Sequence, residues 1–227
     1  MVAETLERNK YGIKRGTGLR KVYFKEYRFS DDLDFTLLEN VGKRALTNRV
    51  NRAIEKAKAE SGINFTGITG LEESTTGYKF KVGLEISQAM NIQLDITAFD
   101  KEEVMLPIGE RKINHIYSDD FYGAVKSYDI EEILIEKIRS IFQGSFPRDL
   151  YDVGYLFERG VKVNKEILEK KFKYRGVVLD IFKFEAQRER MKRAWVASLG
   201  DQINPVPDFD SFFERVSEEL RKIRMVI

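Results

Sequence analysis

The sequence contains no cysteine and a single histidine, His115, among its 227 residues. The absence of cysteine excludes disulfides, thiolate metal ligands and cysteine nucleophiles, and one histidine cannot form a multi-histidine zinc site. A histidine-based catalytic triad would have to use His115 alone. Because His115 lies in an expected strand, residues 112–117, we interpret it as a structural residue.

Long hydrophobic runs are also missing. No apolar run approaches the roughly 20 residues needed to span a bilayer, and the charged N-terminus lacks the core of a signal peptide. We therefore expect a cytoplasmic protein with no membrane contact. The net charge of +2 comes from 39 basic and 37 acidic residues, so the overall charge gives no argument for nucleic-acid binding. Basic clusters, such as residues 170–175 and 188–193, would have to carry that function.

The chain divides by pattern into a mixed part, residues 1–128, and an almost wholly helical part, residues 129–227. In the first part, apolar residues at helical spacing predict one long helix at 44–60, and residues 15–18 predict a turn before a short helix. The expected strands are 11–14, the acid-bearing run ending at 35, 63–69, 78–86, 92–99 and 112–117. In the second part, the first expected helix begins at residue 130. Further helices are expected at 147–159, 165–173, 177–198 and 210–224.

Acidic and apolar residues alternate from Asp32 to Phe35. In a strand, Asp32 and Asp34 would project from one face while Leu33 and Phe35 enter the core. Two carboxylates this close repel one another unless a cation lies between them, and hard oxygen ligands suit Mg²⁺ or Mn²⁺. The alternative is a half-buried edge strand with two solvated acids, and the pattern by itself does not decide between them.

A third carboxylate follows the same rule. Residues 92–97 alternate strictly, so that Ile92, Leu94 and Ile96 face one side of the expected strand. Asp95 lies on the opposite, polar face.

A lysine interrupts the apolar stripe of the first C-terminal helix. Asp129 is an N-cap candidate with Glu132 three residues later, which resembles a capping box. The stripe that follows has Lys137 where an apolar residue is expected. Lys137 either extends from the rim of the core to solvent or directs its ammonium at a negative group.

The next expected helix, residues 147–159, carries two aspartates on one face. Asp149 and Asp152 are three residues apart, and Arg148 and Asp152 are spaced as an i, i+4 ion pair. That pairing alone would be enough to stabilise a helix.

Three segments in this order resemble one family. They are residues 14–23 (KRGTGLRKVY) leading into 28–35 (RFSDDLDF), residues 93–96 (QLDI), and residues 131–138 (EEILIEKI) continuing to 147–152 (PRDLYD). The combination resembles the AbiEii/AbiGii nucleotidyltransferase toxins, which belong to the polymerase-beta-like nucleotidyltransferase superfamily. Residues 193–195 and the last helix resemble the C-terminal helices of that family, so the resemblance covers nearly the whole chain.

The resemblance implies an α+β fold. Residues 1–128 would form a polymerase-beta-like nucleotidyltransferase core, a mixed β-sheet flanked by helices that is shorter at its N-terminus than in the family. Residues 129–227 would form a C-terminal helical bundle that completes the active site.

The resemblance also implies roles for individual residues. Asp32, Asp34 and Asp95 would hold Mg²⁺ or Mn²⁺ against the triphosphate of a bound nucleotide. The catalytic residues implied are Asp32, Asp34, Asp95, Lys137 and Asp149. The nucleotide-binding residues implied are Gly16, Thr17, Lys137, Arg148 and Asp152, with the first two at the start of a helix whose N–H groups can bind phosphate.

Two features depart from the family pattern. Arg15 occupies a position where the family usually has glycine, a residue favoured where the backbone approaches phosphate closely or takes a positive φ. The arginine either distorts the loop or adds a phosphate-binding charge. The chain also has fifteen residues before the glycine motif, where family members have some tens.

By this resemblance the chain is a metal-dependent nucleotidyltransferase. It would be the toxin of a toxin–antitoxin (abortive infection) pair with a cognate antitoxin. It would transfer a nucleoside monophosphate from a nucleoside triphosphate to a hydroxyl acceptor, such as a tRNA 3′ end or a protein. The alternative is a catalytically degenerate relative that binds nucleotide or a partner without turnover. A metal-dependent nuclease is a third interpretation, but it leaves Gly16, Thr17 and Lys137 without roles.

Overall fold

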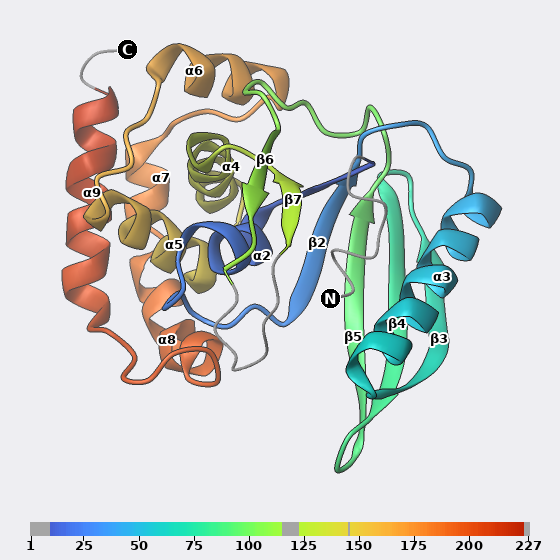
Figure 1. Ribbon diagram of the computed structural model, residues 1–227. Helices are drawn as coiled ribbons and strands as arrows, with labels where there is room; N and C mark the ends of the chain where they lie inside the picture. Colours follow the sequence, from blue (N-terminus) through green and yellow to red (C-terminus); the bar gives the residue numbers. More distant parts are fainter. Residues whose placement is uncertain (1–9, 115–122, 145, 225–227) are drawn as a thin grey trace. The chain divides into compact units, whose positions relative to one another are not determined.

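The structure is a computed structural model that describes residues 10–114, 123–144 and 146–224. Its contacts divide the chain into two compact units, Met1–Tyr128 and Asp129–Ile227 (Figure 1). His115 lies outside the described residues, as does the end of the strand expected at 112–117. No helix in the described ranges is long and apolar enough to cross a membrane.

A mixed β-sheet forms the centre of the N-terminal unit. Its strands in the described residues are β1 (Tyr11–Ile13), β2 (Asp32–Leu37), β3 (Asn64–Glu73), β4 (Gly77–Glu85), β5 (Ala89–Thr97), β6 (Gly109–Lys112) and β7 (Ala124–Ser127), in the order β3-β4-β5-β2-β1-β7-β6. The pairs β2–β5 and β1–β7 are parallel, and the other neighbouring pairs are antiparallel. The α+β prediction is therefore confirmed. Strand β2 has a neighbour on both sides, so its interpretation as an edge strand was wrong.

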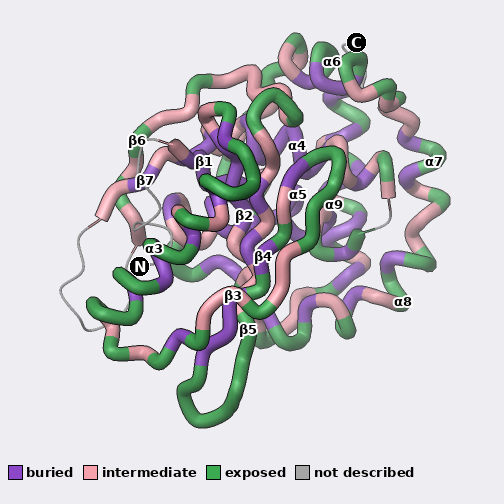
Figure 2. Tube along the Cα trace, turned by 90° about the vertical axis from the view of Figure 1, so that its right-hand side faces the viewer, coloured by how far each residue is buried: buried purple, intermediate pink, exposed green. Residues whose placement is uncertain are grey.

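One face of this sheet packs against helix α3 (Lys43–Ser61), which lies beside β3 and β4 in Figure 1. Phe35 of β2 and Leu94 of β5 are fully buried in the resulting core, as the alternating patterns predicted. The helix contributes its apolar stripe, which consists of Leu46, Val50, Ala53, Ile54 and Ala57. It ends at Gly62, whose φ of 68° is a left-handed conformation that favours glycine. Figure 2 shows the buried segments of the central strands in purple.

The segment before β2 differs from the prediction. Residues 15–18, expected as a turn, form the short helix α2 (Arg15–Gly18), which continues as a π-helical turn, η1 (Leu19–Tyr23). The amide of Gly18 donates to the carbonyl of Lys14 at 2.9 Å and closes the first turn. Glycine at positions 16 and 18 suggested a turn by composition, but here both residues sit within helical backbone.

The C-terminal unit is helical throughout its regular structure. Its helices are α4 (Ile130–Gln143), α5 (Pro147–Glu158), α6 (Lys165–Tyr174), α7 (Ile181–Glu185), α8 (Arg188–Leu199) and α9 (Phe209–Arg224). The single helix expected at 177–198 is instead two helices, α7 and α8. Asp180 caps α7 by accepting a hydrogen bond from the amide of Lys183 at 3.1 Å, and the helix stops at Ala186 before α8 begins.

Aromatic contacts and a buried ion-pair cluster around Lys171 join the helices of this unit. The rings of Tyr151 and Phe212 stack with centroids 5.4 Å apart, which joins α5 to α9. Lys171 of α6 is fully buried and pairs with Glu132 and, at 2.7 Å, with Glu136 of α4. Glu132, expected in a capping box, thus pairs with a lysine on another helix. Asp129 does cap α4, because its Oδ1 accepts from the amide of Glu131 at 3.0 Å.

Candidate functional site

Three aspartates lie on one face of the central sheet. Asp34 of β2 stands directly opposite Asp95 of β5, and Asp32 is two residues before Asp34 on the same strand. Register partners and residues two apart point to the same face of a sheet. That face is the one opposite the apolar core, since Phe35 and Leu94 face the other way. The sheet thus places the three carboxylates expected as metal ligands on one face, with Asp34 and Asp95 as direct neighbours.

The predicted phosphate-binding residue Thr17 contacts the main chain of the acid-bearing strand. Its hydroxyl donates to the carbonyl of Asp32 at 2.7 Å and accepts from the amide of Asp34 at 3.1 Å. Thr17 is almost fully buried. Its hydroxyl therefore fixes α2 to the backbone that carries the two aspartates.

Gly16 lies where a side chain would be crowded. A Cβ at this position would be 3.0 Å from Ser30 Oγ and 3.4 Å from Arg28 Nη2. A side chain at this position would therefore require the Ser30 side chain to shift slightly, because the short helix approaches the segment that leads into β2.

Arg15 occupies a left-handed backbone conformation and contacts the acidic face. Its φ is 54°, in the region where residues with a Cβ are unfavourable and glycine is not. Its Nη1 lies 3.1 Å from Asp34 Oδ1. The arginine side chain is 47% exposed, whereas the Asp34 side chain is only 10% exposed.

A buried ion pair lies one row further along the same sheet face. Thr36 and Thr97 are register partners, two residues beyond Asp34 and Asp95. The buried Lys14 donates to Thr97 Oγ1 at 2.6 Å and pairs with Glu102.

The glutamate of this pair, Glu102, has further partners besides Lys14. Its Oε2 also accepts hydrogen bonds from the hydroxyls of Thr36 at 3.0 Å and Tyr128 at 3.2 Å. Burial alone would raise the pKa of Glu102, but the ammonium of Lys14 outweighs it and holds that pKa at about 2. Burial lowers the pKa of Lys14, although Glu102 opposes that shift.

The sequence analysis did not identify Lys14 or Glu102 as parts of the site. Glu102 follows β5 in an irregular segment without a periodic pattern, and the sequence places Lys14 only in the glycine motif and in a short basic cluster with Arg15. The residue order gives no signal that these two side chains meet, because they are 88 positions apart.

The three carboxylates match a divalent ion in chemistry, but cations already lie beside two of them. Their chemistry fits, since hard oxygen donors suit Mg²⁺ or Mn²⁺, and Asp95 Oδ1 is buried without a hydrogen-bond partner in the described part of the chain. Two cationic side chains already lie beside these carboxylates. Arg15 Nη1 is 3.1 Å from Asp34 Oδ1, and Lys79 Nζ is 3.8 Å from Asp95 Oδ1. Within residues 10–114, 123–144 and 146–224, no three histidine or acidic side chains are grouped closely enough to hold a metal ion.

A second cluster lies within the helical unit. Lys137 Nζ is 2.6 Å from Asp149 Oδ1 and 2.8 Å from Asp152 Oδ2. Lys137 is only 8% exposed and Asp152 is fully buried, so the lysine does not extend to solvent. The side chain of Ser140 donates to the other oxygen of Asp149 at 2.6 Å. The structure thus brings together three of the residues that the resemblance implied.

Arg148 is more exposed than Lys137, Asp149 and Asp152. It is an exposed residue of the first turn of α5, next to Asp149. An acid in the first turn is favourable there because the helix N-terminus carries partial positive charge.

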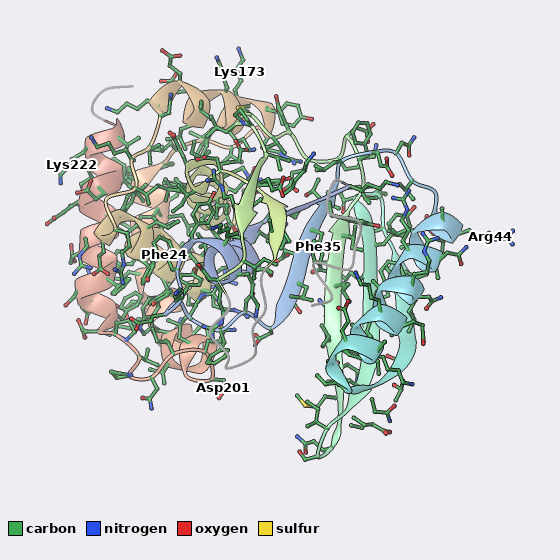
Figure 3. All side chains as sticks on the ribbon, in the orientation of Figure 1. Phe24, Phe35, Arg44, Lys173, Asp201 and Lys222 are labelled. Atoms are coloured by element: carbon green, nitrogen blue, oxygen red, sulfur yellow. The ribbon has the colours of Figure 1, made fainter. Side chains whose placement is uncertain are left out.

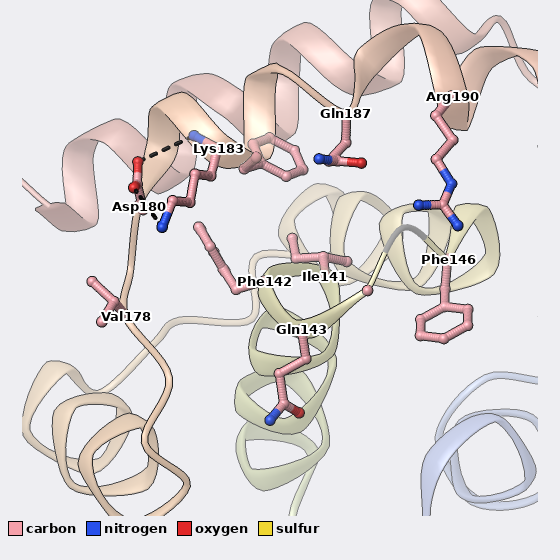
Figure 4. A pocket seen from close by; sticks show the side chains of 11 residues that line it. Ile141, Phe142, Gln143, Phe146, Val178, Asp180, Lys183, Gln187 and Arg190 are labelled. Carbon is pink, nitrogen blue, oxygen red and sulfur yellow. Dashed lines mark hydrogen bonds and ion pairs between the residues drawn. The ribbon is translucent and has the colours of Figure 1, made fainter.

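The helical unit also contains a pocket that the sequence analysis did not predict. It has a volume of about 430 Å³ and is lined mainly by the end of α4, by α7 and by the start of α8 (Figure 4). Phe142 and Phe146 contribute apolar surface to it, while Lys183 and Arg190 contribute positive charge. None of the implied site residues lines it, so this pocket is distinct from the Lys137 cluster.

Comparisons with known proteins identify a family and a shared fold. The family model described as "Nucleotidyl transferase AbiEii toxin, Type IV TA system" matches residues 14–215. No curated protein gives a significant match.

Solved structures with a similar fold include MenT4, a nucleotidyltransferase toxin from Mycobacterium tuberculosis H37Rv. Its TM-score is 0.68 at 17% identity, over 98% of this chain and 80% of that one. JHP933 from Helicobacter pylori has a TM-score of 0.60 at 20% identity, over 99% of this chain and 88% of that one. At these identities the likeness shows a shared fold.

Proposed function

Because the chain belongs to the AbiEii nucleotidyltransferase toxin family, we propose that it transfers a nucleoside monophosphate from a nucleoside triphosphate to a hydroxyl acceptor. The observation that carries this proposal is the shared sheet face of Asp32, Asp34 and Asp95. The type IV toxin–antitoxin assignment of the family further implies a cognate antitoxin.

The three aspartates would hold a divalent ion, Mg²⁺ or Mn²⁺. When bound, such an ion neutralises charge on the phosphate oxygens of the nucleotide. The chain contributes the positions of these carboxylates: Thr17 fixes the backbone at Asp32 and Asp34 from one side. The buried Lys14 ion pair supports the next row of the same face.

Lys137 would bind an oxygen of the triphosphate. Asp149 and Asp152 hold its ammonium from two directions, which limits the rotamers of the lysine side chain. A charged, positioned ammonium is the group that phosphate binding requires. Asp149 and Asp152 are then positioning residues for Lys137, and Arg148 next to them would contact the nucleotide.

The acceptor is either an RNA 3′ end or a protein hydroxyl. The basic clusters that suggested RNA are partly engaged within the helical unit. Lys171 is buried with Glu132, and Arg188 and Lys192 both pair with Asp210, at 2.9 and 2.6 Å. Both acceptor classes therefore belong in the test.

The proposal is tested by incubating the protein with each labelled nucleoside triphosphate, Mg²⁺, and either total RNA or total protein. Wild type is compared with Asp34→Ala and Lys137→Ala, and both variants are expected to lose label transfer. Tight nucleotide binding without transfer would assign the chain to the alternative, a relative that binds without turnover. The ion pair between Arg15 and Asp34 is the observation that favours this second candidate.

A further inference from the structure

The pocket at the end of α4 combines three kinds of side chain within about 430 Å³, a volume in the range of small-ligand sites. Phe142 and Phe146 provide aromatic surface, and Gln143 provides an amide. Lys183 and Arg190 provide positive charge. Aromatic rings stack on nucleobases, amides form hydrogen bonds with base edges, and guanidinium groups bind phosphate. The lining therefore matches the parts of a nucleotide.

Packing positions both aromatic side chains of the pocket. The ring centroid of Phe142 is 5.7 Å from that of Phe172 and 5.8 Å from that of Phe184, and both neighbours are buried. A Cβ at Gly144 would lie 2.5 Å from Cε2 of Phe146, so the Phe146 ring packs directly against the glycine backbone. Phe146 is nevertheless 57% exposed. A ligand would meet aromatic surface that is already in place.

Arg190 differs from its neighbours in the same basic cluster. Arg188 and Lys192, two residues away on either side, both pair with Asp210. The side chain of Arg190 makes no ion pair or hydrogen bond with another residue that the structure describes. A guanidinium can bind phosphate oxygens through two parallel N–H donors. Arg190 is therefore available to an anionic ligand of the pocket.

The two cations lie at opposite ends of the pocket, with Phe142 between them (Figure 4). Lys183 Nζ is 3.8 Å from a carboxylate oxygen of Asp180, which offsets part of its charge. The stronger attraction for an anion is therefore at the Arg190 end, where Phe146 also lies. A phosphate bound there leaves the middle of the pocket, at Phe142, for the base.

We propose that this pocket is a nucleotide-binding site separate from the Lys137 cluster. It takes one nucleobase against Phe142 and Phe146, and the 5′-phosphate of the same nucleotide on Arg190. The ligand is a free ribonucleoside monophosphate or one nucleotide of an RNA strand, since both present the same base and phosphate. The site goes beyond the proposed transfer reaction, because none of the residues assigned to that reaction lines it.

The test measures binding of the four ribonucleoside 5′-monophosphates by calorimetry in the presence of EDTA, which removes divalent ions. We expect Arg190→Gln and Phe146→Ala each to weaken binding of the preferred nucleotide about tenfold or more. Both residues are exposed, so the variants should fold as wild type does. The matching nucleoside and ribose 5-phosphate should each bind about tenfold more weakly than the nucleotide, because each lacks one of the two recognised parts.

Matched controls change the same kinds of side chain outside the pocket. Arg193→Gln removes an exposed charge from α8, and Lys173→Gln removes one from α6, where Figure 3 labels it. Phe182→Ala removes a ring of α7 that is 72% exposed. All three variants should bind the monophosphate as wild type does. Lys137→Ala should also leave this binding unchanged, although it is expected to lose label transfer.

Absence of binding by every monophosphate and by a tetraribonucleotide would overturn the proposal, as would equal losses in pocket and control variants. Binding that Lys137→Ala abolishes and Arg190→Gln retains would place the nucleotide at the Lys137 cluster. That result would also overturn the proposal, while the proposed function would stand. Tighter binding of the tetraribonucleotide, weakened by Lys183→Gln, would identify an RNA strand as the ligand. Equal affinity for the two would identify the free nucleotide.

Discussion

Asp34 and Asp95 face one another directly across the parallel strands β2 and β5. Like charges opposite one another on neighbouring strands destabilise a sheet. One oxygen of Asp95 is also buried without a hydrogen-bond partner in the described residues. The fold therefore tolerates an electrostatic cost at the place where three carboxylates share a face.

The cost at Asp95 leads to a stability prediction. Asp95→Asn removes one negative charge at nearly constant volume and should raise the free energy of unfolding by about 0.5 to 1 kcal/mol. The same variant should lose nucleotidyl transfer. Urea unfolding measures the first effect. Asp100→Asn, a change at an exposed acid outside the sheet, should leave stability within about 0.5 kcal/mol. Equal stability changes in the two variants would contradict the argument.

The buried pair of Lys14 and Glu102 predicts a defined acid sensitivity. The pKa of Glu102 falls from 4.5 to about 2 on folding, so the ionised carboxylate stabilises the fold above pH 4.5. That stabilisation, up to about 3 kcal/mol, is lost as the pH falls from 4.5 towards 2. Urea unfolding at several pH values should show a steeper loss for wild type than for Glu102→Gln. Parallel pH profiles for the two proteins would rule out this role for Glu102.

The neighbouring residues Lys170 and Lys171 should differ greatly in how much their substitution lowers the free energy of unfolding. Lys171→Met leaves the buried carboxylates of Glu132 and Glu136 without their cation and should cost about 3 to 5 kcal/mol of unfolding free energy. Lys170→Met, at an exposed position one residue earlier in α6, should change it by less than about 0.5 kcal/mol. Thermal unfolding of both variants provides the comparison. A Lys171 variant as stable as the Lys170 variant would show that the buried pair contributes little.

Replacing Gly154 with alanine should destabilise the protein, although such a substitution inside a helix usually stabilises. Replacing a helix-interior glycine with alanine normally stabilises by about 1 kcal/mol. A Cβ at Gly154 would lie 2.6 Å from Phe212 Cδ1 and 3.2 Å from Val216 Cγ2, so the Phe212 ring or α9 itself would have to shift. Gly154→Ala should therefore destabilise by about 1 to 3 kcal/mol in chemical denaturation. Phe212→Leu should recover part of this loss in the double variant, whereas additive losses would argue against a clash with that ring.

The sequence predicted best what local patterns determine. The alternation around Asp34 correctly placed Phe35 in the core, and the stripe of α3 correctly identified its buried face, because side-chain direction follows directly from strand and helix periodicity. The break between α7 and α8 has no sequence signal, because it falls at Ala186 and Gln187, where neither glycine nor proline interrupts the helical pattern.

Contacts between segments that are distant in the chain could not be predicted from local sequence patterns. The register that sets Asp34 opposite Asp95 depends on strand pairing, and neither strand encodes its partner. Lys137 carried two interpretations until the structure showed it buried between Asp149 and Asp152. The positive φ at Arg15 has one sequence signal, which is that the resembling family usually has glycine at this position.

The most direct test of the central claim compares two labels in one assay. The protein is incubated with Mg²⁺, total RNA or protein, and nucleoside triphosphates labelled at either the α- or the γ-phosphorus. Nucleotidyl transfer predicts that only the α label enters the acceptor, that pyrophosphate appears in equal amount, and that Asp34→Asn abolishes both. Entry of the γ label, or α-label transfer that survives Asp34→Asn, would contradict the account.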